Sequence, residues 1–556
     1  MKKISLLPSH LTLITYHLSL LFAVCCRSVA APATECDAAL TDLQRAIAMV
    51  DATMQHTFTD GNSLRMYDLY NTVTHQGSGT ADVWPYTAAL EAHCSVLEAL
   101  DALQTAAPQL YQDTHDRYVA RLKQLFGALD YYRGTYTLYS YAQIKSWSIY
   151  GVHRSNTKGT AAVTGIENVY DDQMWLCREL VRAYRLTGDA DYLQKAEYLA
   201  NYCIDGWDCC LDADGQEYGG ITWGPGYNSK HSCSNGPLIQ PLVWLYEIYN
   251  TADEEPSLRY FYILPDGTRT NAMRRHSEVY LEFARKIYAW QKQKLYNASA
   301  GVYHDMLGAP GELKYVGEGR NRYRDHVDTG SPTGTAYTYN TGTMLAATAE
   351  LYRVTGEAHY LSDLNTLCST TWTYFAKGTR RDGVVYREWP TDKKAEEGFN
   401  AWFDNVLMRA YVDAAPYNTT LYNSQPHTTN ALLSYEQNLD YAYANHNRDQ
   451  MLPIDLLGGW SVSTGDADVT KGFHQLAFAA EYAMLAVWRQ RQAVAEASVA
   501  APPTSGAAAK RGVYSLDGRT VGTSAGTSQL PRGIYVSQGR KVLLHSHFTS
   551  VKLMVR

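Results

Sequence analysis

The chain has 556 residues, enough for one large domain and a small one, and 46% of them are hydrophobic against 19% charged. This composition is typical of globular proteins and excludes a disordered chain. The formal net charge of −7 argues against nucleic acid as a partner, because binding to phosphates requires a basic surface.

The N-terminus has the pattern of a secretion signal. Lys2 and Lys3 precede an apolar run over residues 11–24, and Ser-Val-Ala at 28–30 offers small residues for cleavage. We therefore predict a signal peptide over residues 1–30 and an exported protein that is periplasmic, at the cell surface or secreted. Lipidation at Cys25 or Cys26 is the alternative, but Val24 before Cys25 fits that pattern poorly.

Between about residues 36 and 495, apolar residues recur at helical spacing, mostly with short loops between the segments. Tyr-Arg-Leu-Thr-Gly-Asp at 184–189 and Tyr-Arg-Val-Thr-Gly-Glu at 352–357 mark the same helix–turn–helix unit twice. About twelve helices with such internal similarity fit six hairpins closed into a ring, so residues 33–495 are predicted to form an all-α domain, an (α/α)6 barrel. The expected helices are 36–56, 84–105, 111–131, 170–187, 190–204, 236–250, 273–296, 339–355, 358–375, 399–414, 428–446 and 471–494.

Three long segments interrupt this helical pattern. Residues 132–169, 206–235 and 301–338 are rich in Gly, Tyr, Trp, Asn and Ser. Long loops in a compact domain are usually functional, so we interpret them as the walls of a cleft, with surface elaboration as the alternative. The 44 tyrosines suit such a cleft, and they suit equally well a helical core that uses Tyr in place of Phe.

Two adjacent acids, Asp171 and Asp172, begin the expected helix 170–187. An acid at a helix start is commonly a cap, but only one of two neighbours can take that position. Adjacent side chains diverge on a helix, so the two carboxyl groups can flank one bond of a substrate about 5 Å apart, as in retaining glycoside hydrolases. The sequence thus leaves a cap and a catalytic pair both open.

The motifs around these acids resemble glycoside hydrolase family 76. Tyr-Asp-Asp-Gln-Met-Trp at 170–175 resembles the active-site helix of that family, and Gly-Gly-Ile-Thr-Trp at 219–223, Lys-His-Ser-Cys-Ser-Asn-Gly at 230–236 and Tyr-Asn-Thr-Gly at 339–342 follow in the family's order. Phe399, at the start of a later helix, matches less well. The resemblance covers roughly residues 36 to 495.

The resemblance implies a retaining, endo-acting hydrolase that cleaves α-1,6-mannosidic linkages in mannan backbones without a cofactor. It implies Asp171 as the nucleophile and Asp172 as the acid/base. Ionised Asp171 would raise the pKa of its neighbour, which is the sign that an acid requires. The expected partner is an α-mannan polysaccharide or oligosaccharide.

Aromatic and amide side chains in the same motifs are candidates for contact with the sugar. Flat rings suit the apolar face of a pyranose, and Lys or Asn can hydrogen-bond its hydroxyl groups. A core position is the alternative for any one Trp, and Asn235 is equally suited to cap the next helix. The predicted substrate-binding residues are Trp84, Tyr170, Trp175, Trp223, Lys230, Asn235, Tyr339 and Asn340.

No metal site is predicted. Asp208, Asp212 and Asp214 resemble part of a calcium loop, but the ligand expected at the twelfth position is missing, so we interpret the segment as a turn. Eight cysteines follow residue 30. They can form structural disulfides, for example Cys209 or Cys210 with Cys233, or remain buried thiols.

The composition changes after Arg491. Residues 496–511 are rich in Ala, Pro and Ser and are predicted to be a linker. Residues 512–556 contain short β-like runs at 512–516, 530–536 and 541–544, and they resemble the C-terminal β tail of exported Bacteroidetes proteins. That resemblance implies sorting or attachment by an export machinery, with a small binding module as the alternative.

Three other functions compete with mannan hydrolysis. A cell-wall transglycosylase would use the same two acids with a sugar acceptor in place of water. A non-catalytic glycan-binding protein of a surface uptake system would not need both acids. An (α/α)6 enzyme acting on uronides would need a basic cleft, which the Tyr-rich segment near 132–150 does not supply.

Overall fold

The computed structural model describes residues 34–59, 61, 63–252, 255–390, 400–460 and 468–500, together with four short strands between residues 512 and 544. The predicted signal peptide, most of the linker and Phe399 lie outside the described residues. No helix in the described part is long and apolar enough to cross a membrane.

Every predicted helix is present, and most begin or end within three residues of the expected position. The helices are α2 (Glu35–Thr57), α3 (Val83–Leu103), α4 (Pro108–Ala128), α5 (Tyr170–Thr187), α6 (Ala190–Asp205), α7 (Gly236–Asn250), α8 (His276–Leu295), α9 (Thr338–Thr355), α10 (Ala358–Phe375), α11 (Asn400–Ala414), α12 (His427–Asn445) and α13 (Gly472–Ala500).

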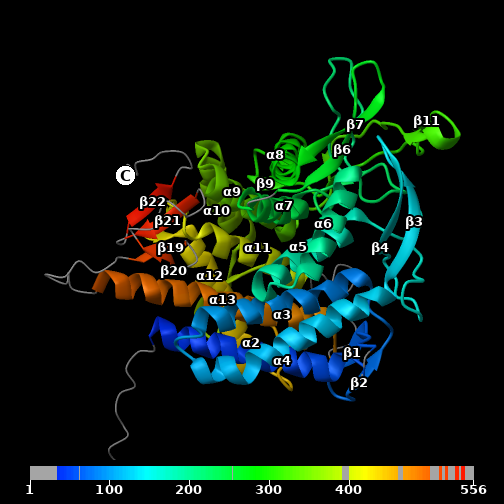
Figure 1. The fold of residues 1–556 in the computed structure, drawn as a ribbon. Coiled ribbons are helices and arrows are strands. Elements are labelled where there is room, and N and C mark those ends of the chain that lie inside the picture. The colour runs from blue at the N-terminus through cyan, green and yellow to red at the C-terminus, as the bar shows by residue number, and fades with distance from the viewer. Residues whose placement is uncertain are drawn as a thin grey trace, which may run out of the picture.

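Figure 1 shows the helices packed side by side, and their packing partners place them in two concentric rings. The inner ring runs α3, α5, α7, α9, α11 and α13, and it closes because α13 packs against α3. The other six helices lie outside it: α4, α6, α8, α10 and α12 each pack against the inner helix that precedes them in the chain, and α2 packs mainly against α13. The (α/α)6 barrel predicted from the sequence is therefore confirmed.

Burial follows from the place of each helix in the rings. The inner helix α9 buries every residue from Thr338 to Leu351, and α3 buries every residue from Tyr86 to Leu97. The outer helix α4 instead buries one stripe, Thr114, Tyr118, Leu122 and Leu125. A helix that is covered on all sides must be apolar or paired all round, whereas an outer helix needs one apolar face.

The repeated sequence unit ends its helices in the same way twice. Gly188 after α5 and Gly356 after α9 adopt left-handed backbone conformations, with φ of 70° and 68°. Their N–H groups donate to the carbonyls of Tyr184 and Tyr352, at 2.7 and 2.8 Å. Glycine favours this conformation because it has no Cβ, and the turn then directs the chain into the outer helix.

Charged side chains tie the inner helices together beneath the N-terminal end of α5. Arg178 lies 3.8 Å from Glu91, and Arg182 pairs with Glu179 at 2.8 Å. Arg409 on α11 also pairs with Glu91. Each of these side chains is at most 6% exposed. Pairing inside the ring compensates the cost of burying the charges and fixes α3, α5 and α11 relative to one another.

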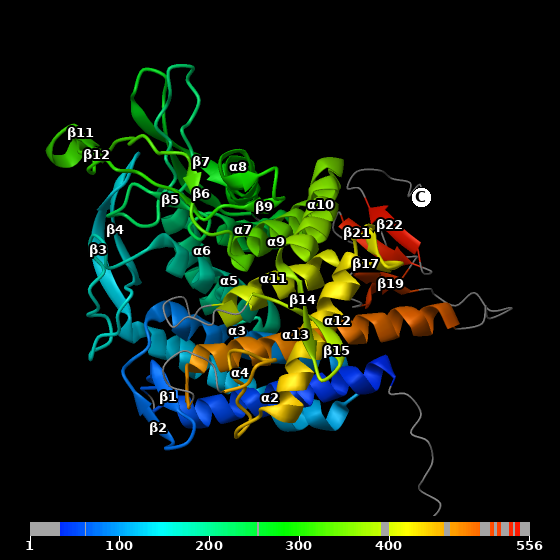
Figure 2. The ribbon, with the colours of Figure 1, turned by 180° about the vertical axis from the view of Figure 1, so that it is seen from behind.

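Hairpins that the sequence analysis did not predict are inserted between helices. The longer ones are β3 (Arg133–Tyr139) with β4 (Ile144–Tyr150), β6 (Ser257–Ile263) with β7 (Arg269–Arg275), and β14 (Lys377–Arg381) with β15 (Val384–Glu388). A three-stranded sheet joins two predicted cleft walls, in the order β13 (Pro332–Thr333), β10 (Met306–Leu307) and β5 (Lys230–His231). Figure 2 shows β3–β4 and β6–β7 on one side of the barrel.

The remaining elements are short. They are β1 (Leu69–Asn71), β2 (Gln76–Ser78), η1 (Leu129–Tyr131), β8 (Tyr296–Asn297), β9 (Val302–Tyr303), β11 (Tyr315–Val316), η2 (Gly319–Asn321), β12 (Tyr323–Arg324), β16 (Leu421–Tyr422), β17 (Gln425–Pro426) and β18 (Val469–Thr470). The C-terminal strands β19 (Gly512–Ser515), β20 (Thr520–Thr523), β21 (Gly533–Ser537) and β22 (Arg540–Leu544) form a sheet in the order β20-β19-β21-β22.

Candidate active site

Asp171 and Asp172 lie in the first turn of α5, and neither acts as its cap. The residue before the helix, Val169, is extended and makes no side-chain cap. The helix start is held instead by two loops. The Tyr170 N–H donates to the carbonyl of Trp223 at 2.8 Å, and the Gln173 side-chain amide donates to the carbonyl of Tyr150 at 2.8 Å. Capping therefore does not explain the two acids.

Burial sets the electrostatics of the pair. Burial raises the pKa of Asp171 to about 6, although the Cys233 thiol and the Trp223 indole N–H act in the opposite direction. Burial raises the pKa of Asp172 well above its ordinary value, and the charges of Asp171 and Asp82 raise it further. Asp172 is 3% exposed, whereas Asp171 is partly exposed. Asp171 thus ionises first and Asp172 keeps its proton to higher pH.

The buried Oδ1 of Asp171 makes no hydrogen bond to any described residue. A buried carboxyl oxygen without a partner is uncommon, because leaving it unpaired costs about 1–3 kcal/mol. Such atoms concentrate at functional sites, where a substrate atom completes the arrangement.

An aromatic cluster stands beside the acids. Trp84 on α3 contacts Trp402 on α11 edge to face, with ring centroids 5.2 Å apart, and Trp402 contacts Trp175 at 4.6 Å. Phe403 bridges to Tyr339 at 4.5 Å. The sequence analysis missed Trp402 and Phe403, because the resemblance drew attention to Phe399 three positions earlier. Within the cluster, Trp84 and Phe403 remain partly exposed.

Trp223 lies in the loop between α6 and α7. Its backbone is fixed from both sides, since its carbonyl accepts from Tyr170 and its N–H donates to the carbonyl of Ser229 at 2.9 Å. Its ring stacks on His231 at 5.0 Å and contacts Tyr227 at 4.7 Å. The ring is partly exposed, so Trp223 has a free surface next to Asp171.

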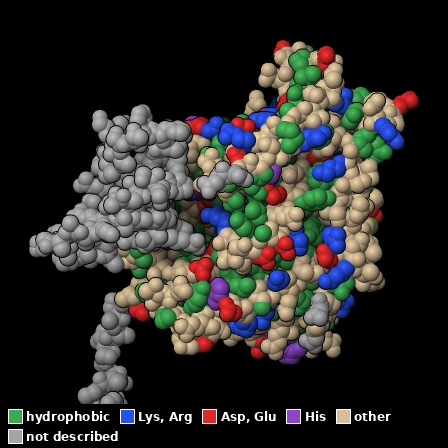
Figure 3. All heavy atoms as spheres, in the orientation of Figure 1, with side chains coloured by type: hydrophobic (Ala, Val, Ile, Leu, Met, Phe, Trp, Pro, Cys, Tyr) green, Lys and Arg blue, Asp and Glu red, His purple; other side chains and the backbone are tan. Residues whose placement is uncertain are grey.

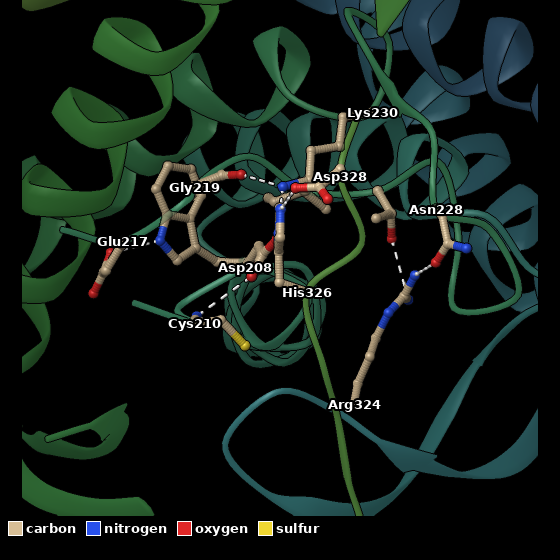
Figure 4. A network of polar contacts seen from close by, with 12 residues as sticks. Asp208, Cys210, Glu217, Gly219, Asn228, Lys230, Arg324, His326 and Asp328 are labelled. Atoms are coloured by element: carbon tan, nitrogen blue, oxygen red, sulfur yellow. Dashed lines mark hydrogen bonds and ion pairs between the residues drawn. The ribbon is translucent and has the colours of Figure 1, made fainter. Parts of the chain in front are cut away.

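A buried ion pair supports this loop (Figure 4). The Lys230 ammonium lies 2.8 Å from Asp208 and donates to the carbonyl of Gly219 at 2.5 Å. His326, from the next cleft wall, reaches the same Asp208 oxygen at 2.7 Å. Burial raises the pKa of Asp208, but Lys230 and His326 outweigh it and hold that pKa below its usual value. Lys230 is 3% exposed, and its ammonium is engaged by Asp208 and the Gly219 carbonyl within the protein.

Arg324 holds the same loop from the other side. Its guanidinium donates to the side chain of Asn228 at 3.0 Å, to the carbonyl of Pro225 at 3.1 Å and to the carbonyl of Tyr227. Arg324 is 3% exposed. Figure 4 shows it approaching the loop opposite Lys230. Two buried cations thus clamp the loop that carries Trp223.

Three other predicted contact residues make hydrogen bonds within the protein. Asn235 is fully buried, accepting from the Ile221 N–H at 2.8 Å and donating to the Ile221 carbonyl at 2.9 Å. Asn340 donates to the Thr335 carbonyl at 3.2 Å. Tyr339 donates its hydroxyl to Asp305 at 2.8 Å. These pairings occupy side chains that were expected to contact sugar hydroxyl groups.

Exposure separates the eight predicted residues into two groups. Trp84 and Trp223 are partly exposed. The others are buried, with Tyr170 1% and Trp175 3% exposed. The Tyr170 ring packs on Tyr202 with a centroid distance of 5.0 Å. Burial therefore leaves Trp84 and Trp223 as the residues of this set that can present a ring to a ligand.

The described residues contain no group of three or more His, Cys, Asp or Glu that could hold a metal ion. The calcium-like segment forms the predicted turn, because Asp212 accepts from the N–H groups of Asp214 and Gln216, both at 2.9 Å. The eight described cysteines are unpaired thiols, so the possible bridge from Cys209 or Cys210 to Cys233 is absent from this structure.

Residues 104–254 and 271–498 match the family model described as glycosyl hydrolase family 76. The chain belongs to glycosyl hydrolase family 76. Its fold is similar to that of a family 76 mannosidase, Bt3792 of Bacteroides thetaiotaomicron VPI-5482, with a TM-score of 0.56 and 20% identity over 80% of this chain and 98% of that one.

Two further relatives are informative. An inactive variant of the family 76 α-1,6-mannanase GH76A of Salegentibacter sp. HEL1_6, in complex with α-1,6-mannotriose, gives a TM-score of 0.51 at 20% identity over 80% of this chain and 99% of that chain. The mannan endo-1,6-α-mannosidase DCW1 of Saccharomyces cerevisiae is 25% identical over 225 residues, which cover 39% of this chain and 40% of the yeast protein.

Proposed function

We propose that this family 76 protein is a retaining glycoside hydrolase that cuts α-1,6-mannosidic linkages within mannan backbones. The observation that carries the proposal is the adjacent pair Asp171 and Asp172, which caps nothing and whose pKa values are raised to different extents. In the Salegentibacter mannanase that was solved with mannotriose, the inactive variant replaces two adjacent aspartates by asparagine. The yeast relative is named as an endo-acting enzyme on the same linkage.

The direction of the pKa difference between the two acids supports their proposed roles. Asp171, the more acidic group, attacks the anomeric carbon and forms a covalent glycosyl-enzyme, while Asp172 donates its proton to the departing glycosidic oxygen. Esterification of Asp171 removes its negative charge, so the pKa of Asp172 falls. Asp172 can then take a proton from the water that attacks the intermediate, and the product keeps the configuration of the substrate.

The accessible rings define where the sugar lies. Trp223 adjoins Asp171, and its indole N–H favours the ionised form of that carboxyl group. Trp84 offers a second ring across the cluster formed with Trp402. We infer that these two rings pack on the apolar faces of mannose residues near the cleaved bond. The pattern of residues 1–30 supports export, so we propose that the reaction takes place outside the cytoplasm.

Product stereochemistry tests this proposal. Proton NMR during hydrolysis of unbranched α-1,6-mannan should show the α-anomer of the new reducing end first, with the β-anomer appearing later by mutarotation. Initial β-product would refute the nucleophilic role of Asp171. Products longer than the substrate at high sugar concentration would instead favour the transglycosylase alternative.

A further inference from the structure

A second hollow lies outside the inner ring, between the β3–β4 hairpin, the C-terminal end of α6 and strand β6. Its volume is about 390 Å³, within the range of about 300–1,000 Å³ that small-ligand pockets occupy. Both ribbon views place these three elements together on the same side of the barrel (Figures 1 and 2). Neither Asp171 nor Asp172 lines this hollow.

One wall of the hollow is polar. Asp205, the last residue of α6, accepts from the Ser140 hydroxyl and the Gln143 amide, both at 2.8 Å and both through Oδ1. Its Oδ2 and the indole N–H of Trp147 are buried and meet no hydrogen-bond geometry with described residues. Burial raises the pKa of Asp205 to about 6, and the indole of Trp147 acts against that rise. The accessible polar side chains on this side of the hollow are those of Gln143, Lys145 and Asn201, which can hydrogen-bond to a polar ligand.

The opposite wall is apolar. Tyr260 and Phe261 on β6 line it and are half-buried, so part of each ring faces the hollow. Phe283 on α8 lies behind Tyr260, with ring centroids 5.8 Å apart. Flat rings on one side and hydrogen-bonding groups on the other match a pyranose, which has an apolar face and a rim of hydroxyl groups.

We propose that this hollow is a second, non-catalytic binding site for a neutral oligosaccharide segment of the mannan that the protein cleaves. The inference rests on the proposed function for the identity of the sugar. A neutral ligand that hydrogen-bonds to both kinds of charged group fits, because the lining holds the Asp205 carboxyl together with the cations of Lys145 and Arg259 and is not of one sign. Hydroxyl groups of the sugar hydrogen-bond to the accessible side chains of Gln143, Lys145 and Asn201, and the sugar face packs on Phe261.

The position of the hollow gives it a role in polymer hydrolysis. Trp147 contacts Tyr202 at 5.4 Å, and Tyr202 contacts Tyr170, the residue before Asp171, at 5.0 Å. The hollow is therefore two ring contacts away from the catalytic helix start, too far for its ligand to be cut. A chain held there keeps other parts of the same polysaccharide at high local concentration near the acids.

Affinity electrophoresis in gels that contain unbranched α-1,6-mannan tests the inference. The background is the full chain with Asp171→Asn and Asp172→Asn, so that no mannan is cut. Phe261→Ala should reduce the retardation of the protein band by mannan about threefold or more, because only one of the two mannan-binding sites, the catalytic one, then remains. Asn201→Ala, which changes the α6 side of the hollow, should act in the same direction. Tyr262→Ala on the same strand is the matched control, because Tyr262 does not line the hollow.

Kinetics in the otherwise unchanged protein separate this inference from the proposed function. Phe261→Ala should leave kcat/KM on α-1,6-mannotetraose within twofold of wild type and lower it about threefold on long mannan. Equal retardation of Phe261→Ala, Asn201→Ala and the Tyr262→Ala control would overturn the inference. A wild-type protein that cuts neither substrate would refute the proposed function, while Phe261-dependent retardation would still support a second mannan site.

Discussion

Replacing Lys230 by methionine probes the clamp beneath the Trp223 loop. The substitution keeps the length of the side chain but removes the ammonium that pairs with Asp208 at 2.8 Å and donates to the Gly219 carbonyl. Asp208 is then left buried with His326 and the Cys210 N–H, which lie at 2.7 and 3.3 Å. Breaking a buried pair on one side costs about 3–5 kcal/mol. Because two hydrogen-bond partners of Asp208 remain, we expect the free energy of unfolding to fall by an amount near the lower end of that range, about 3 kcal/mol.

Urea unfolding followed by tryptophan fluorescence measures this loss, with Lys314→Met as the control at an exposed lysine in the neighbouring cleft wall. The double variant Lys230→Met with Asp208→Asn should be clearly more stable than the sum of the single losses predicts, because it leaves no uncompensated charge. We also expect kcat/KM on mannan to fall about tenfold or more in Lys230→Met, since the loop positions Trp223. Additive losses, or a single loss no larger than that of the control, would refute the reasoning.

Three further predictions concern other buried groups. Burial raises the pKa of Asp171 to about 6, so kcat/KM should decline below about pH 6. The Trp223 N–H opposes that rise, so Trp223→Phe should move the acidic limb of the pH profile to higher pH. An unmoved limb would contradict the assignment of this limb to Asp171. Arg324→Ala should raise KM on mannan about threefold or more, because it loosens the loop that carries Trp223. Arg322→Ala, at an exposed neighbouring position, should not raise KM. Equal KM values for the two variants would exclude a clamping role for Arg324. Burial raises the pKa of Glu481 well above its usual value, so the folded state retains a proton that the unfolded state loses above about pH 4.3. The free energy of unfolding should therefore fall with rising pH by up to about 1.4 kcal/mol per pH unit. Urea titrations at pH 5 and pH 8 should show a smaller fall for Glu481→Gln than for wild type. An equal fall in both proteins would contradict this account of Glu481.

The helices could be predicted because their signals are local. The sequence Tyr-Arg-Leu-Thr-Gly-Asp at 184–189 contains both the last turn of α5 and the glycine that ends it, and the structure ends α5 at Thr187. The closure of the ring followed from the number of hairpins and their similarity. The β3–β4 hairpin was missed, although Ser146 and Ser148 alternate with Trp147 and Ile149 in the period of two that is typical of a strand.

The environment of individual side chains could not be predicted in the same way. Lys230 and Asp208 are 22 residues apart and Asp208 and His326 are 118 apart, so no local spacing reports their contact. A lysine in a Gly-rich loop has the same local signature whether it binds a substrate or a buried carboxylate. The acids differ in this respect, because two adjacent charges at a helix start form an unusual local pattern that a cap does not explain.

Hydrolysis of unbranched α-1,6-mannan by wild type, Asp171→Asn and Asp172→Asn tests the central claim most directly. Wild type should release short mannooligosaccharides, and each variant should lose about 10³-fold or more in kcat, because the two carboxyl groups act in one reaction. Circular dichroism establishes that the variants fold as wild type does. Retention of activity within tenfold in either folded variant, or a wild-type protein that releases no mannooligosaccharide, would contradict the account.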